Sequence, residues 1–239
     1  MQITTKLGVA LPDTLAKAWS MHAFDQELAE LKEKLLTMAS HAESGVHRAV
    51  EAFVKRDYDM ALLVQADDTV IDRFEIEVDD LAIRLLTRLP RADNVRLITV
   101  AMKISQNLER VGDETTTIAR RVQELCQELP LKVEVDIVRM ANLAVEMLKG
   151  ALDAFVNQDP ATARALIPQD KEIDWLNKQN HRCLAEQMAK DPDTVMRCLD
   201  VIVISKSLER IADHAKNVAE EVVYLCEAQD IRHIAATRV

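Results

Sequence analysis

Apolar residues recur along this chain at alternating steps of three and four positions, the spacing of a helix that packs in a bundle. Between positions 104 and 125, small or apolar residues occur at Ile104, Leu108, Val111, Thr115, Ile118, Val122 and Leu125. The same spacing returns later in the chain with Leu208, Ile211, Ala215, Val218, Val222 and Leu225. Both stretches are therefore predicted to be long helices with one buried stripe.

These two stretches are copies of each other. The first, which begins at Ser105, reads SQNLERVGDETTTIARRVQEL, and the second, which begins at Ser205, reads SKSLERIADHAKNVAEEVVYL. An earlier pair also matches, because residues 52–72 read AFVKRDYDMALLVQADDTVID and residues 154–174 read AFVNQDPATARALIPQDKEID. Repetition at a nearly constant offset predicts two equivalent structural halves.

Prolines and charged turns divide the chain into six predicted helices, three in each half. Their approximate ranges are 25–55, 60–88, 93–128, 135–157, 160–190 and 194–227, with an interruption expected near Pro168. The predicted fold is all-α: two tandem three-helix bundles with long antiparallel helices. The predicted division is residues 1–21 as an N-terminal extension, 22–130 as the first bundle, and 131–239 as the second bundle with a short C-terminal tail.

Each half carries two pairs of carboxylates, and the members of each pair are four residues apart. In the first half these are Asp68, Asp72, Glu109 and Asp113, which we call the first acidic cluster. In the second half they are Asp170, Asp174, Glu209 and Asp213, the second acidic cluster. Heptad positions b and f turn the later pair of each cluster away from the buried seam, so we expect it on an exposed face.

A solvated charged face is the simplest interpretation of one such pair, but its recurrence in both halves favours a metal site. Carboxylates are hard oxygen ligands and suit iron, manganese, magnesium or calcium better than a soft-ligand zinc site. Without a cation the four acids would repel one another, and some would take up protons. All eight carboxylates are therefore candidate metal ligands. His214 beside Asp213 could supplement them.

The composition is typical of a helical protein, and its net charge argues against two classes of partner. The 239 residues include only 4 Gly and 6 Pro, and 30 Lys and Arg stand against 40 Asp and Glu, a net charge of -10. Nucleic acids and anionic membranes both attract basic residues, so neither is an expected partner. No apolar run is long enough for a signal peptide or a membrane span, which predicts a cytoplasmic protein without direct membrane insertion.

The chain lacks the sequence motifs of several enzyme classes. A ferritin-like di-metal site needs Glu-x-x-His on two helices, and the chain contains no such sequence. The chain also lacks a P-loop, a G-x-G-x-x-G motif and a G-x-S-x-G motif. We therefore expect a protein that is not an enzyme. A carboxylate-rich metal-binding or storage protein, or a di-metal enzyme, is the alternative function.

The chain resembles the PhoU family of bacterial phosphate-signalling regulators. The resemblance rests on LERVGDETTTIA, LERIADHAKNVAE, DDTVID, DKEID and the tandem halves, and it covers about residues 22–228. It implies two three-helix bundles and, as in some members, metal clusters on the Glu/Asp-x-x-x-Asp pairs. The candidate ions are iron, manganese, magnesium or zinc. With His214 and Asn217, the second copy matches the family pattern better than the first, which has Glu114 and Thr117 there.

The resemblance also implies a function. Such proteins are cytoplasmic negative regulators of phosphate uptake and of the phosphate-starvation response. They couple the phosphate ABC transporter, through its ATPase subunit, to a sensor histidine kinase, by binding and conformational relay. Dimers are common in the family, so a homodimer is expected.

Overall fold

The computed structural model describes residues 13–88 and 92–232, with side chains from His22 onward. Every regular element in this part of the chain is a helix. The first half contains α1 (Asp13–Lys55), α2 (Tyr58–Ala66), α3 (Asp68–Leu86) and α4 (Ala92–Cys126). The second half contains α5 (Ile137–Asn157), α6 (Pro160–Leu166), η1 (Ile167–Gln169), α7 (Asp170–Lys190), η2 (Pro192–Thr194) and α8 (Val195–Glu227).

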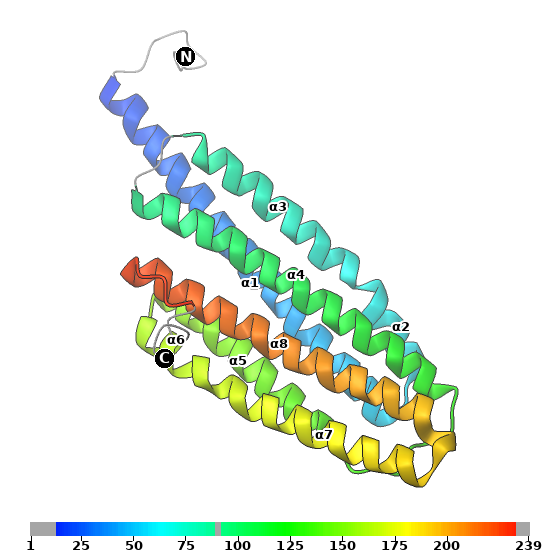
Figure 1. Ribbon diagram of the computed structural model, residues 1–239. Coiled ribbons are helices and arrows are strands. Elements are labelled where there is room, and N and C mark those ends of the chain that lie inside the picture. Colours follow the sequence, from blue (N-terminus) through cyan, green and yellow to red (C-terminus); the bar gives the residue numbers. More distant parts are fainter. Residues whose placement is uncertain (1–12, 89–91, 233–239) are drawn as a thin grey trace.

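In each half three long helices pack lengthwise, α1 with α3 and α4, and α5 with α7 and α8 (Figure 1). The short helices α2 and α6 pack against α4 and α8. The two bundles join where α4 lies along α8, and α1 also contacts α5 (Figure 1). The predicted all-α fold of two tandem three-helix bundles is confirmed. No helix in the described residues is long and apolar enough to cross a membrane.

The two stripes predicted from the repeat form the centre of the core. Every position of both stripes is buried, including the polar Thr115. Leu108 and Leu208 are both 0% exposed, so equivalent positions in the two halves are equally enclosed. Burial of such side chains contributes roughly 1.5–3 kcal/mol each and is the main force that holds the bundles together.

Two helix boundaries differ from the prediction. The first helix begins at Asp13 and not near residue 25, because neither Gly nor Pro interrupts the chain between Asp13 and Gly45. It therefore runs through the predicted boundary between residues 21 and 22, and the predicted extension before Asp13 lies outside the described residues. The division of the chain into residues 1–21, 22–130 and 131–239 stays a prediction.

The predicted second helix is two helices, α2 and α3, separated at Asp67. The Asp67 N–H still bonds to the carbonyl of Leu63 (3.1 Å), and α3 then starts in a new direction. In the second half the interruption expected near Pro168 occurs as η1 between α6 and α7. Ala66 stands at the repeat-equivalent of Pro168, so this break belongs to the shared fold and does not require proline.

The connection between the bundles is short, and arginines from both halves hold its start. Arg56, at the end of α1, donates to the carbonyls of Leu125 and Glu128. Arg197 on α8 donates to the carbonyl of Leu129 (3.0 Å). Side chains from both halves thus fix the start of the linker, which agrees with the close coupling expected from its length.

Candidate functional site

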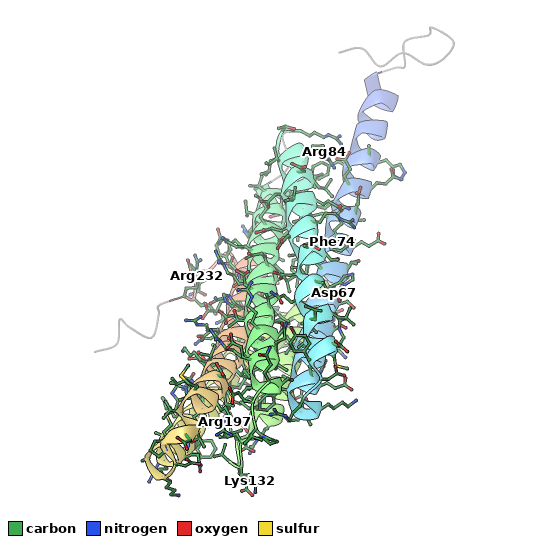
Figure 2. All side chains as sticks on the ribbon, turned by 90° about the vertical axis from the view of Figure 1, so that its right-hand side faces the viewer. Asp67, Phe74, Arg84, Lys132, Arg197 and Arg232 are labelled. Atoms are coloured by element: carbon green, nitrogen blue, oxygen red, sulfur yellow. The ribbon has the colours of Figure 1, made fainter. Side chains whose placement is uncertain are left out.

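The first acidic cluster lies where the start of α3 faces the middle of α4. Figure 2 shows this side of the molecule, with Asp67 just before α3 and Phe74 on it. Gly112 allows a close approach, because a Cβ at this position would lie 3.0 Å from Oδ1 of Asp68. The hydroxyl of Thr116, one turn further along α4, donates to the Asp68 carboxylate. Asp68 is therefore held against α4 by a glycine and a neutral donor.

The four acids of this cluster lie within electrostatic range of one another. Burial, followed by the negative charge of Asp72, raises the pKa of Asp68. Burial, followed by the charge of Asp113, raises the pKa of Glu109 to about 7. The structure thus brings together the carboxylates that the sequence placed on two separate helices. Their mutual repulsion is a cost that a bound cation would remove.

Glu109 is not on a solvated face, which corrects the expectation from its heptad position. Its side chain is only 18% exposed, whereas that of Asp113 is 52% exposed. The reason is that α4 packs against α1, α3 and α8, so positions beside its main seam are also covered. Asp113 alone of this pair lies where the sequence analysis expected both.

The sequence analysis missed further carboxylates on α3. The charges of Asp72 and Asp113 both help to raise the pKa of Glu75, after burial and the charge of Asp79. The spacing could have revealed them, because Asp68, Asp72, Glu75 and Asp79 continue along one helix flank at steps of four, three and four. The first acidic cluster is therefore part of a longer acidic strip.

Two arginines, Arg110 and Arg120, accompany the first acidic cluster, and the charge of Arg120 has the smallest of the effects on the pKa of Asp68. Arg110 contacts Glu109 and Asp113, each at 3.5 Å, and its side chain is 55% exposed. Ion pairs at this distance and exposure contribute about 0–1 kcal/mol. Arg110 therefore balances the cluster only weakly from its outer side.

The second acidic cluster has the same four acids but different neighbours. Asp170 is buried, and the ammonium group of Lys216 donates to its Oδ2. Lys206 donates to Oε2 of Glu209. Burial and the charge of Glu209 raise the pKa of Asp213, which the nearby Lys216 lowers in turn. Two lysines thus neutralise the carboxylates of this half from within the protein.

The two lysines have neutral equivalents in the first half. Lys216 corresponds to Thr116 and Lys206 to Gln106, each one hundred positions earlier. Glu75 of the acidic strip corresponds to Asn177 on α7. Each difference makes the second half less negative than the first. The lysines were visible in the sequence three residues from Glu209 and from Asp213, and the Lys206–Glu209 pair follows from that spacing. The partner of Lys216, Asp170, depends on the packing of α7 on α8.

His214, which the sequence analysis considered as an extra ligand, hydrogen-bonds across to the first half. Its Nδ1 lies 3.0 Å from Oδ1 of Asn107 on α4, and Asn217 donates to the same oxygen (3.3 Å). Burial lowers the pKa of His214, and the nearby Glu114 partly offsets this. The two residues that favoured the second copy in the family pattern therefore serve the contact between the halves.

A groove of about 1140 Å³ runs between α4, α8 and the turn from α6 to α7. Its walls include Asp170, Asp174 and Lys216 of the second half and Arg110 of the first half. Arg232, labelled in Figure 2, also lines it, beside the buried Glu221 (3.2 Å). The second acidic cluster is consequently open to small ions from solvent.

The fit to a metal ion differs between the halves. In the described part of the chain, no three His, Cys, Asp or Glu side chains converge closely enough to hold a metal ion as they stand. The first acidic cluster nevertheless offers the donor set of a hard cation, four carboxylates on two facing helices. The second offers the same acids with ammonium groups already bound to two of them. The first half fits a metal ion chemically, and the second half does not.

A tandem pair of helical bundles with matched acidic clusters defines an all-helical repeat protein. The family model of the PhoU domain matches this chain twice, at residues 35–122 and 137–222. A curated relative from Pseudomonas aeruginosa, named phosphate-specific transport system accessory protein PhoU homolog, is 37% identical over 90% of each chain. A relative of the same name from Rhizobium meliloti is 34% identical over 88% of this chain and 90% of its own. The chain therefore belongs to the PhoU family.

Solved structures agree. The crystal structure of PhoU from Pseudomonas aeruginosa has a TM-score of 0.83 and 36% identity, and the match covers 86% of this chain and all (100%) of that one. The phosphate transport system regulatory protein PhoU from Streptococcus pneumoniae has a TM-score of 0.77 at 26% identity, with 87% of this chain and 99% of that chain covered. The resemblance stated from the sequence is confirmed.

Proposed function

We propose that this protein is a cytoplasmic accessory protein of a phosphate-specific transport system and a negative regulator of phosphate uptake and of the phosphate-starvation response. It couples the phosphate ABC transporter, through its ATPase subunit, to a sensor histidine kinase, and it performs no chemistry of its own. One observation carries this proposal: relatives named for that system align over nine tenths of this chain, across both halves.

The contact between α4 and α8 is suited to relaying a signal between the halves. Charged pairs cross it, with Arg210 bonded to Glu114 (3.0 Å) and Lys103 bonded to Glu221 (2.9 Å). Polar interfaces of this kind can exchange partners when one side moves, whereas a tightly packed apolar core resists such changes. We propose that binding of a partner to one half shifts this contact and alters the surface of the other half.

We also propose that the first acidic cluster binds a divalent or trivalent cation through Asp68, Asp72, Glu109 and Asp113. Magnesium, manganese and iron suit these oxygen ligands, and zinc suits them less well. A cation there would neutralise the four charges and tie the start of α3 to the middle of α4. We propose a structural or regulatory role for this cation and no catalytic one.

Gene deletion tests the regulatory role. In high phosphate, cells that lack this gene should express alkaline phosphatase, because the negative regulator of the starvation response is missing. Reintroduction of the intact chain should restore repression. Unchanged repression in the deletion strain would contradict the regulatory proposal.

A variant of the inter-half contact tests the relay. Glu114→Gln combined with Arg210→Gln removes the pair across α4 and α8 while keeping similar side-chain volumes. We expect the variant to fold and to bind the transporter ATPase in a pull-down, but to repress alkaline phosphatase less. The matched control is Arg182→Gln, which removes a pair with Glu186 (3.2 Å) within α7 alone and should repress fully. Equal repression by both variants would contradict the relay.

Partner binding separates this proposal from the alternatives of a metal-storage protein or a di-metal enzyme. Pull-downs from phosphate-replete cells should recover the transporter ATPase and the sensor kinase. Light scattering should give twice the 26.9 kDa chain mass, as expected for a homodimer. Promoter DNA should show no shift at physiological salt, given the net charge of -10.

A further inference from the structure

The two acidic clusters contain the same four acids, yet only one of them contains lysines. Lys216 donates to the buried Asp170, and Lys206 donates to Glu209, whose side chain is 13% exposed. The stem of Lys216 is itself largely covered, with 31% of its side chain exposed. The Lys216 contact is therefore an ordered one within the packing of α7 on α8, whereas Lys206 and Glu209 pair three residues apart along α8.

We propose that Lys206 and Lys216 are built-in counter-ions that keep metal ions out of the second half, so that this chain binds metal in its first half alone. The statement about the first half rests on the proposed function of the first acidic cluster. The statement about the second half rests on the two lysine contacts.

The physical reason is competition for the same oxygens. An ammonium group is a compact positive charge with three hydrogen-bond donors, and it neutralises a carboxylate much as a metal ion does. A metal ion that enters the second acidic cluster must displace Lys216 from Asp170 and meet the repulsion of a displaced ammonium group nearby. Removing the partner of a buried carboxylate is costly, and the entering ion would have to overcome that cost before gaining its own ligands.

Access to solvent does not explain the difference. Asp170, Asp174 and Lys216 line the groove of about 1140 Å³, so two acids of the second cluster face space that solvent can enter. In the first half the equivalent of Lys216 is Thr116, whose neutral hydroxyl donates to Asp68 and leaves the charge of the cluster unchanged. Arg110 reaches Glu109 and Asp113 there only at 3.5 Å from the exposed side, and the charge of Arg120 has the smallest of the effects on the pKa of Asp68.

The experiment uses the full chain and Mn²⁺ as the probe. Glu109→Gln with Asp113→Asn removes two ligands of the first cluster and gives a background that reports on the second half alone. In this background, titration calorimetry should detect no Mn²⁺ binding. Adding Lys206→Gln and Lys216→Thr copies the first-half residues into the second half. This variant should bind one Mn²⁺ per chain, in the second half, with a rise in melting temperature that chelation reverses.

Two further variants and the unmodified chain serve as controls. Lys206→Arg with Lys216→Arg keeps both charges and should still exclude Mn²⁺. Lys206→Gln with Lys216→Gln keeps a donor to Asp170 and replaces the threonine variant if circular dichroism shows that variant unfolded. Mn²⁺ binding by the background, or no gain in either lysine-free variant, would overturn the proposal. Failure of the unmodified chain to bind Mn²⁺ would refute only the site in the first half, because the background and its lysine-free variants decide the second half independently.

Discussion

The first and second halves of this molecule share a core and differ in the charge beside it. The stripes of α4 and α8 have apolar or small residues at the same positions and the same complete burial. Next to them, the first half has Thr116, Gln106 and Glu75, where the second has Lys216, Lys206 and Asn177. Packing thus fixes the fold of each half, whereas a few flanking charges decide what that half can bind.

The largest expected effect concerns the apolar core that the two halves share. Leu208→Ala with Ile211→Ala removes two side chains that are 0% exposed and should cost about 2–5 kcal/mol each in unfolding free energy. Leu108→Ala with Val111→Ala in the first half should be similarly severe. Urea denaturation followed by circular dichroism measures both. A mild effect in one half only would show that the two cores are not equivalent.

The next prediction concerns the lysine that distinguishes the halves. Lys216→Met should destabilise the protein by about 1–3 kcal/mol, because the buried Asp170 loses its partner. The equivalent change, Thr116→Val, removes one hydrogen bond to Asp68 and should cost about 1 kcal/mol. Denaturant melts of the two variants give the comparison. A larger cost for Thr116→Val would contradict our view of Lys216 as the counter-ion.

Asp200, in the contact between the halves, should make the stability of the protein depend on pH. Burial, followed by the charge of Glu124, raises the pKa of Asp200 to about 6, and Arg121 opposes the shift. A raised pKa means that the folded protein holds this proton more tightly, so the contribution of Asp200 to stability falls as pH rises from about 4 to about 6. The equivalent in the first half is Val100, which does not titrate.

Asp200→Asn removes this dependence. The variant should be more stable than the parent protein at pH 7–8, and the difference should shrink toward pH 4–5. Melting temperatures measured across this range provide the test. A difference that grows as the pH falls would show that Asp200 is stabilised in its charged form.

The smallest effect concerns the acids themselves. Glu109→Gln with Asp113→Asn relieves repulsion in the first half and should raise stability in metal-free buffer by about 0.5 kcal/mol. Glu209→Gln with Asp213→Asn also removes the partner of Lys206, so it should lower stability by about 0.5–1 kcal/mol. Effects of the same sign in both halves would mean that the lysines do not change the charge balance.

The sequence predicted what depends on periodicity and repetition. The alternation of three and four positions identified the buried stripes, and the repeat identified the paired acids on each half. It did not predict the covered position of Glu109, because burial of a flanking position depends on how many helices surround α4. The break at Asp67 was missed for a similar reason, since no proline marks it in the first half.

His214 and Lys216 show the same limit at the candidate site. The family pattern made His214 a mark of the better metal site, whereas its hydrogen bond goes to Asn107 across the inter-half contact. Lys216 is plain in the sequence, but only the packing of α7 on α8 brings its partner Asp170 beside it. Spacing along one helix identifies neighbours on that helix only, such as Lys206 and Glu209 on α8. The contacts of His214 with Asn107 and of Lys216 with Asp170 cross between two helices.

The pairing of α4 with α8 has the arrangement expected of two copies of one bundle. Arg210 bonds to Glu114, and the repeat-equivalent residues Arg110 and His214 also meet in this contact. In a symmetric dimer of single bundles, one such pair would occur twice, once on each side of the twofold axis. Duplication and fusion of an ancestral gene would free the two copies to change separately. Here one pair is the ion pair of Arg210 and Glu114, whereas the twin of Glu114 is His214, which bonds to Asn107.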